Sequence, residues 1–226
     1  MPSKAYGMFN FKLGEVEQVL QARTLLNQEI YMNRRGRRNL GALHKSALIL
    51  LCAAWEAYVE ELLSESLDFV ISKVSTPTEL SKNLQKELCD HVKKDKHELK
   101  ALELCGDGWK KLCREIVKIK VKYFNTPRLV NVQNLYVTFF DEDVTKFEIT
   151  EQDDKGAIIK KACWRGINNM VNDRCEHAHA CSKKYLTESE LRTYRDFLEK
   201  GVLLMDKNLC AAVQRLTSQR PWHYPR

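Results

Sequence analysis

The sequence contains few residues that interrupt regular structure, with only 9 glycines and 5 prolines among 226 residues. Long regular elements are therefore expected. It also lacks a glycine-rich phosphate loop and any alternation of strand and helix patterns, which argues against a nucleotide-binding α/β fold. The longest strictly apolar run, ALILLCAAW at 47–55, is nine residues long and too short to span a bilayer, so no membrane partner is expected.

Paired cysteine motifs and a targeting segment are absent as well. No two cysteines are separated by two residues, and the opening MPSKAYGMFNFKLGEVEQ has no apolar core of the kind found in targeting peptides. We therefore expect a cytoplasmic protein whose eight cysteines are reduced thiols rather than a disulfide framework. They are Cys52, Cys89, Cys105, Cys113, Cys163, Cys175, Cys181 and Cys210.

Basic residues outnumber acidic ones. The net charge is +7 and the isoelectric point about 8.9, which permits an anionic partner such as RNA without requiring one. The stretch NRRGRRN at 33–39 interrupts the apolar pattern. Its arginines either guide RNA phosphates electrostatically or decorate a solvated loop. They are Arg34, Arg35, Arg37 and Arg38.

Apolar residues recur at helical spacing along most of the chain. The predicted helices cover about 16–30, 41–74, 76–104, 109–123, 130–140, 155–180 and 187–216. The apolar run at 47–55 predicts a helix that is buried on every side. The fold class is therefore an all-α helical bundle in one domain over 1–226. Its core helices lie at about 15–74 and 155–216, with a mostly helical middle insertion at about 76–153.

The stretch NDRCEHAHAC at 172–181 concentrates charged and titratable side chains near a predicted helix end. The apolar stripe of that helix leads to Arg174, which therefore falls on the core-facing side. A buried arginine requires a carboxylate or a functional role, and the central helix offers Glu56 and Glu60. His177 shares the face of Arg174, whereas His179 shares a face with Cys175.

Three explanations of this stretch compete. Cys175 with His179, and His177 with Cys181, are i,i+4 pairs that could bind zinc, but the two pairs point to different sides. We therefore expect neither a metal nor a cofactor. An acid–base site needs less, because a histidine can move protons near neutral pH and an arginine can hold a phosphate. The third explanation is an ordinary helix end with polar side chains.

The motif RCEHAH at 174–179 resembles the R-x4-6-H motif of HEPN domains (higher eukaryotes and prokaryotes nucleotide-binding). AWEAYVE at 54–60 resembles the A-W-E-x-Y-V-E signature of one branch, the RiboL-PSP-HEPN type. The resemblance continues in FNTP at 124–127, VNVQNL at 130–135, WRGI at 164–167 and the last helix from Glu190. It extends from about residue 15 to residue 216.

The resemblance implies an all-α fold, often dimeric, with two R-x4-6-H motifs at a shared cleft. Many members are metal-independent endoribonucleases of toxin–antitoxin systems, phage or other antiviral defence, or RNA processing. By position, Arg174 would hold the phosphate, His179 would be the general acid or base, and Glu56 would orient Arg174. Cys175 replaces the usual polar residue and Ala180 the usual glycine, while His177 lies nearer Arg174 on an ideal helix.

Three hypotheses about function follow. The first is a metal-independent endoribonuclease that cleaves RNA by 2′-hydroxyl transesterification. It would act as a homodimer with a composite site, under the control of a cognate antitoxin or another regulatory protein. The second is a catalytically inactive dimeric module that binds RNA or a protein. The third is a zinc- or thiol-dependent enzyme built on Cys175 and Cys181.

Overall fold

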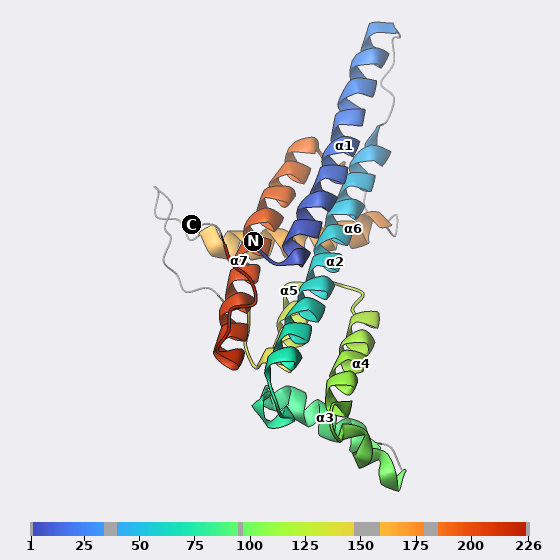
Figure 1. The fold of residues 1–226 in the computed structure, drawn as a ribbon. Coiled ribbons are helices and arrows are strands. Elements are labelled where there is room, and N and C mark those ends of the chain that lie inside the picture. The colour runs from blue at the N-terminus through green and yellow to red at the C-terminus, as the bar shows by residue number, and fades with distance from the viewer. Residues whose placement is uncertain (1, 34–39, 95–96, 147–158, 179–184, 225–226) are drawn as a thin grey trace. The chain divides into compact units, whose positions relative to one another are not determined.

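The computed structural model describes residues 2–33, 40–94, 97–146, 159–178 and 185–224, and within these ranges it is all-α with no strand (Figure 1). The predicted fold class is confirmed. None of the helices in these ranges is long and apolar enough to cross a membrane. The elements are α1 (Lys4–Asn33), α2 (Gly41–Lys73), the 3-10 turn η1 (Pro77–Glu79), α3 (Lys82–Lys94), the 3-10 helix η2 (Glu98–Leu104), α4 (Gly108–Lys122), α5 (Leu129–Phe140), α6 (Ile159–Ala178) and α7 (Glu188–Thr217).

The chain forms two compact units. The first comprises residues 1–6, 59–146 and 203–226, and the second comprises residues 7–58 and 147–202. The helices α2 and α7 each contribute one part to each unit. The single domain over residues 1–226 stays a prediction.

The second unit is built on aromatic contacts of α2. Trp55 is fully buried and lies 6.3 Å from Trp164 of α6 between ring centroids, while Tyr58 lies 5.7 Å from Phe9 of α1. The Tyr58 hydroxyl donates a hydrogen bond of 3.0 Å to the carbonyl of Val202 in α7. The described part of α2 in this unit therefore contacts α1, α6 and α7.

The prediction that the apolar run of α2 is buried on every side is wrong. Ile49 in this run is 46% exposed and Ala53, one turn later, is also exposed. On α1, Leu26 is 42% exposed, although Val16 and Leu20 are buried. Hydrophobicity marks residues that favour burial, but the neighbouring helices cover only part of each surface.

The helices α6 and α7 approach closely at a glycine. A Cβ atom on Gly166 of α6 would lie 2.1 Å from Cδ2 of Phe197 in α7. Gly201 of α7 is similarly close to α6, because its Cβ would lie 2.8 Å from Cδ1 of Ile167. The close packing of these helices therefore depends on residues without side chains.

In the first unit, the long helix predicted at 76–104 is broken into η1, α3 and η2. The Thr76–Glu79 pair does form, with Thr76 N donating to Glu79 Oε1 over 2.8 Å, but it opens only η1. Ser81 caps α3 by accepting a hydrogen bond of 3.2 Å from Leu84 N, and Asp141 accepts from Lys82 N. A local cap from Ser81 and a distant one from Asp141 therefore start a new helix at Lys82.

The segment that contains Trp222 and Tyr224 packs against α7. Trp222 is only 6% exposed, and its Nε1 donates a hydrogen bond of 3.0 Å to the Tyr224 hydroxyl. Asp206 of α7 is fully buried and accepts hydrogen bonds from the Tyr224 hydroxyl and the Ser3 hydroxyl. One carboxylate therefore binds residues from both ends of the chain.

Candidate functional site

The helix α6 carries Arg174 at the end of its buried stripe. Cys163, Ile167, Met170 and Val171 are all buried, as their helical spacing predicted. Arg174 follows Met170 by one turn and is half-buried. Its side chain therefore lies at the edge of the core rather than inside it.

Glu56 of α2 is electrostatically coupled to Arg174, as the sequence suggested. Burial raises the pKa of the Glu56 carboxyl, and the Arg174 guanidinium opposes that rise. Among the residues that the structure describes, no ion pair to Arg174 is formed. The carboxylate can therefore bias the position of Arg174, while the guanidinium keeps hydrogen-bond donors for an anion.

Cys52 connects the two helices behind Arg174. It lies one turn before Glu56 on α2, is buried, and points its Sγ at the carbonyl of Met170 over 3.8 Å. Burial raises the pKa of this thiol to about 12, against the opposing effect of Arg174. Glu56, Asp173 and Cys175 raise it further, so all three lie within electrostatic reach of Cys52. The Cys52 thiol is therefore neutral and unreactive, and it contributes to the site only by packing.

A hydrogen bond between Asp173 and Tyr194 fastens the end of α6 to α7. The Tyr194 hydroxyl donates to Asp173 Oδ2 over 2.6 Å, and both side chains are half-buried. Burial raises the pKa of Tyr194, and the Asp173 carboxylate adds to that rise. Sequence reasoning missed this pair. The only signal was an aspartate directly before Arg174, and no pattern pointed to residue 194.

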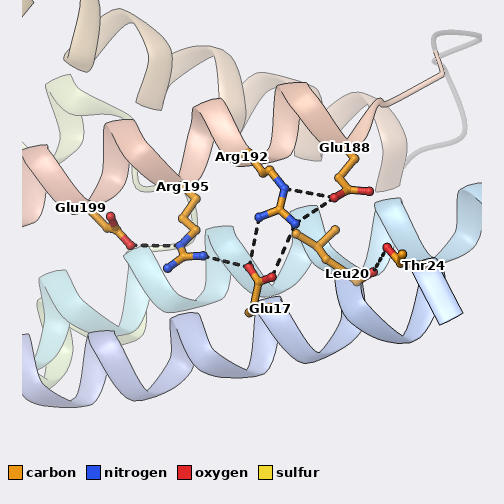
Figure 2. Close-up of polar contacts among 7 residues, drawn as sticks. All are labelled: Glu17, Leu20, Thr24, Glu188, Arg192, Arg195 and Glu199. Carbon is orange, nitrogen blue, oxygen red and sulfur yellow. Dashed lines mark hydrogen bonds and ion pairs between the residues drawn. The ribbon is translucent and has the colours of Figure 1, made fainter.

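An ion-pair network connects the same part of α7 to α1 (Figure 2). Arg195 Nη1 lies 2.9 Å from Glu17 Oε2 of α1, and Arg192 Nη2 lies 2.8 Å from Glu188 Oε1. Glu17 also accepts from Arg192 over 3.4 Å. Exposed ion pairs contribute about 0.2–1 kcal/mol each, so the network orients α7 more than it stabilises the fold.

His177 is buried, with only 8% of its surface exposed. Its Nδ1 atom makes no hydrogen bond to any residue for which the structure gives a position. Cys175 is half-buried and follows Arg174 directly. Arg174, Glu56 and Cys175 thus all lie within electrostatic reach of Cys52. His177 follows Arg174 by about one turn, and its Nδ1 has no partner within the described part of the chain.

Other predicted site residues lie outside the described residues. These are His179, the general acid or base of the motif, and the arginines at 34, 35, 37 and 38. Cys181 lies outside them too, so neither zinc-binding pair can be assembled from the structure. Within the described ranges, no cluster of three or more histidine, cysteine, aspartate or glutamate side chains could hold a metal ion.

The comparisons with known proteins gave one match. The model of the RiboL-PSP-HEPN family matches residues 18–211. The matched range contains Cys52, Glu56, Arg174 and Tyr194, together with the whole of the R-x4-6-H motif. No curated protein matches the chain, and neither does any solved structure.

Proposed function

Because the chain belongs to the RiboL-PSP-HEPN family, we propose that it is a metal-independent endoribonuclease. The family supports a nuclease-like or RNA-related role in general. In the proposed reaction the 2′-hydroxyl of the RNA attacks the adjacent phosphorus, and the bond to the 5′-oxygen breaks. A base takes the 2′-hydroxyl proton, an acid protonates the leaving 5′-oxygen, and a 2′,3′-cyclic phosphate forms.

The observation that carries this proposal is the state of Arg174. It is half-buried beside Glu56 at the end of α6, and its guanidinium forms no ion pair within the described part of the chain. A structural arginine at the edge of a core would be expected to pair with a carboxylate. In the proposal, Arg174 stabilises the negative charge that develops on the phosphorane, and Glu56 orients it.

His179 is the proposed general acid or base, by its position in the motif. His177 is the competing candidate, because its buried Nδ1 is free of partners among the described residues. Cys175 stands where the family usually has a polar residue, and a thiol is a weak hydrogen-bond donor. That substitution favours the alternative function, a catalytically inactive dimeric module that binds RNA or a protein partner.

The decisive experiment measures cleavage of RNA by the purified protein with excess chelator. We expect cleavage that survives the chelator and that is lost in Arg174→Ala and in His179→Ala, both folded by circular dichroism. Arg165→Ala is the matched control, because Arg165 is an exposed arginine on the same helix. The products should carry a 2′,3′-cyclic phosphate or its hydrolysis product.

The variants also separate the alternatives. Full activity in a folded His179→Ala protein, with loss in His177→Ala, would move the base to His177. Activity that disappears with chelator and returns with zinc would favour the metal-dependent enzyme instead. A wild-type protein that binds RNA but cleaves none would favour the non-catalytic module.

The proposed partners follow from the same family. A homodimer with a composite site is supported by exposed apolar side chains in the second unit, with Leu25 61% and Ile49 46% exposed. Light scattering during size-exclusion chromatography tests the dimer. The toxin–antitoxin, antiviral-defence or RNA-processing setting, the cognate antitoxin, the cytoplasmic location and the guiding role of the arginines at 34, 35, 37 and 38 also remain proposals.

A further inference from the structure

The helix α4 is strongly basic, and it is far in sequence from the R-x4-6-H motif. This helix of fifteen residues, GWKKLCREIVKIKVK, has six basic residues and one acidic residue, which leaves a net charge of +5. The net charge of the whole chain is +7. A single short helix of the first unit therefore accounts for most of the basic excess.

Burial separates α4 into two faces. The buried face consists of Trp109, Leu112, Cys113, Ile116 and Val117. Lys111, Lys118 and Lys122 lie on the opposite face at helical spacing and are all exposed. We call these three lysines the α4 stripe. It extends over about 16 Å of the helix axis, which is long enough to contact several phosphates of one RNA strand.

The remaining cations of α4 have acidic partners, whereas the α4 stripe has none among the residues with described positions. Lys110 pairs with Asp107 at 2.8 Å, and Arg114 pairs with Asp68 at 2.7 Å. Lys120 pairs with Glu87 at 2.7 Å. Within the described ranges, no carboxylate forms an ion pair with Lys111, Lys118 or Lys122.

An exposed aromatic ring adjoins the α4 stripe. Tyr123, directly after α4, is 72% exposed, and the Nζ of Lys122 lies 6.0 Å from its ring centroid. Ile119 beside it is 51% exposed. A solvated basic face would account for the lysines alone, but it gives no reason for an exposed ring beside them. Proteins that bind single-stranded nucleic acids combine cations that contact the phosphates with aromatic rings that stack on the bases. This surface offers both.

We propose that the α4 stripe and Tyr123 form a docking surface for single-stranded RNA. The lysines contact phosphates and the tyrosine ring stacks on a base. This surface uses none of the residues around Arg174. The inference rests on the proposed function only in taking RNA as the ligand.

The test compares two variants of equal charge in the full-length chain. Lys111→Gln/Lys118→Gln/Lys122→Gln removes the α4 stripe, and Lys45→Gln/Lys200→Gln/Lys207→Gln removes three exposed lysines elsewhere. Binding of fluorescein-labelled oligouridine is followed by fluorescence anisotropy over a range of salt. Each lost phosphate contact reduces the magnitude of the negative slope of log K against log salt by about 0.7. The slope of the stripe variant should therefore be smaller in magnitude than that of the wild type by about 2.

This difference in slope can also be measured as a difference in how strongly salt weakens binding. Between about 50 and 200 mM salt, the wild-type affinity should fall roughly 20-fold more than that of the stripe variant. The control variant should follow the wild type. Glu115→Gln should strengthen binding, because Glu115 is the acidic residue within the basic face. Tyr123→Ala should weaken binding at least roughly five-fold.

Three results would overturn the inference. Equal salt slopes for the stripe variant and the control variant would show that the stripe makes no phosphate contacts. Absence of RNA binding by the wild type would have the same meaning. Binding to phosphatidylserine vesicles that depends on the stripe, with RNA binding unchanged, would assign the stripe to an anionic membrane surface instead.

Cleavage assays keep this inference separate from the ribonuclease proposal. The stripe variant should retain kcat at saturating RNA and show a raised KM, because the residues around Arg174 are intact. Arg174→Ala should lose cleavage and reduce the salt slope by no more than about 0.7, the value for a single phosphate contact. A wild type that binds through the stripe without cleaving would refute the ribonuclease alone.

Discussion

The contact between Gly166 and Phe197 gives a quantitative test of the α6–α7 packing. In Gly166→Ala, the new Cβ would meet Phe197 at 2.1 Å from Cδ2 and 2.7 Å from Cγ. Carbon atoms in contact are about 3.5–4.0 Å apart, so the ring or the helix must move by more than 1 Å. Overpacking of this kind costs about 1–3 kcal/mol, against a gain of about 1 kcal/mol from the better helix propensity of alanine.

We therefore expect Gly166→Ala to lower the unfolding free energy by about 1 kcal/mol, which for a chain of this size lowers Tm by about 2–4 °C. Gly14→Ala in α1 is the matched control, because nothing lies within 4 Å of its Cβ position. It should gain about 1 kcal/mol. Circular dichroism at increasing temperature measures both. If the two variants shifted Tm in the same direction, the close approach at Gly166 would be refuted. Phe197→Leu should rescue Gly166→Ala.

Two further predictions concern polar contacts. Tyr194→Phe should lower the unfolding free energy by about 1.5 kcal/mol, because it removes a hydrogen bond to the Asp173 carboxylate. Urea unfolding measures this change, with Tyr185→Phe as the control because Tyr185 is 78% exposed. Equal stabilities of the two variants would contradict the prediction. Burial raises the pKa of Asp206 above its ordinary value of 3.8, so its contribution to stability is present below that value and is lost as the pH rises through the folded pKa. The wild type should therefore lose stability with rising pH more steeply than Asp206→Asn, and parallel pH profiles in urea unfolding would argue against this.

Predictions from the sequence are most accurate for features that depend on spacing within a single helix. On α6, apolar residues at helical spacing mark the side of the helix that faces the core. Those on this side are buried, as the spacing predicts: Cys163, Ile167, Met170 and Val171. The capping pair Thr187 and Glu190 is likewise a local feature, since both partners lie within one turn. Local physics determines these features.

Prediction fails where the partner lies elsewhere in the chain. Asp141 helps to cap the start of α3, and it lies 59 residues from Lys82. Ile49 is exposed although its neighbours in sequence are buried, because helix packing leaves that side uncovered. The Asp173–Tyr194 hydrogen bond depends on how α6 and α7 meet. None of these features has a periodic signature.

For the candidate site, the sequence suggests which residues take part but does not predict their contacts. The sequence suggests Glu56 as a partner for Arg174, because a core-facing cation needs a carboxylate and the family motifs contain both residues. Their coupling without an ion pair in the described residues depends on side-chain reach, which spacing does not specify. The concentration of charge on α4 was present in the sequence, but its pairing with Asp68 and Glu87 was not.

The shared carboxylate of Asp206 has a consequence for protein engineering. Ser3 and Tyr224 both donate to this one side chain, so two positions 221 residues apart in sequence lie within the reach of a single carboxylate. A cross-link engineered between these two segments would therefore need to span only a short distance. It would close a very long loop, and closing a long loop removes the most conformational entropy from the unfolded chain.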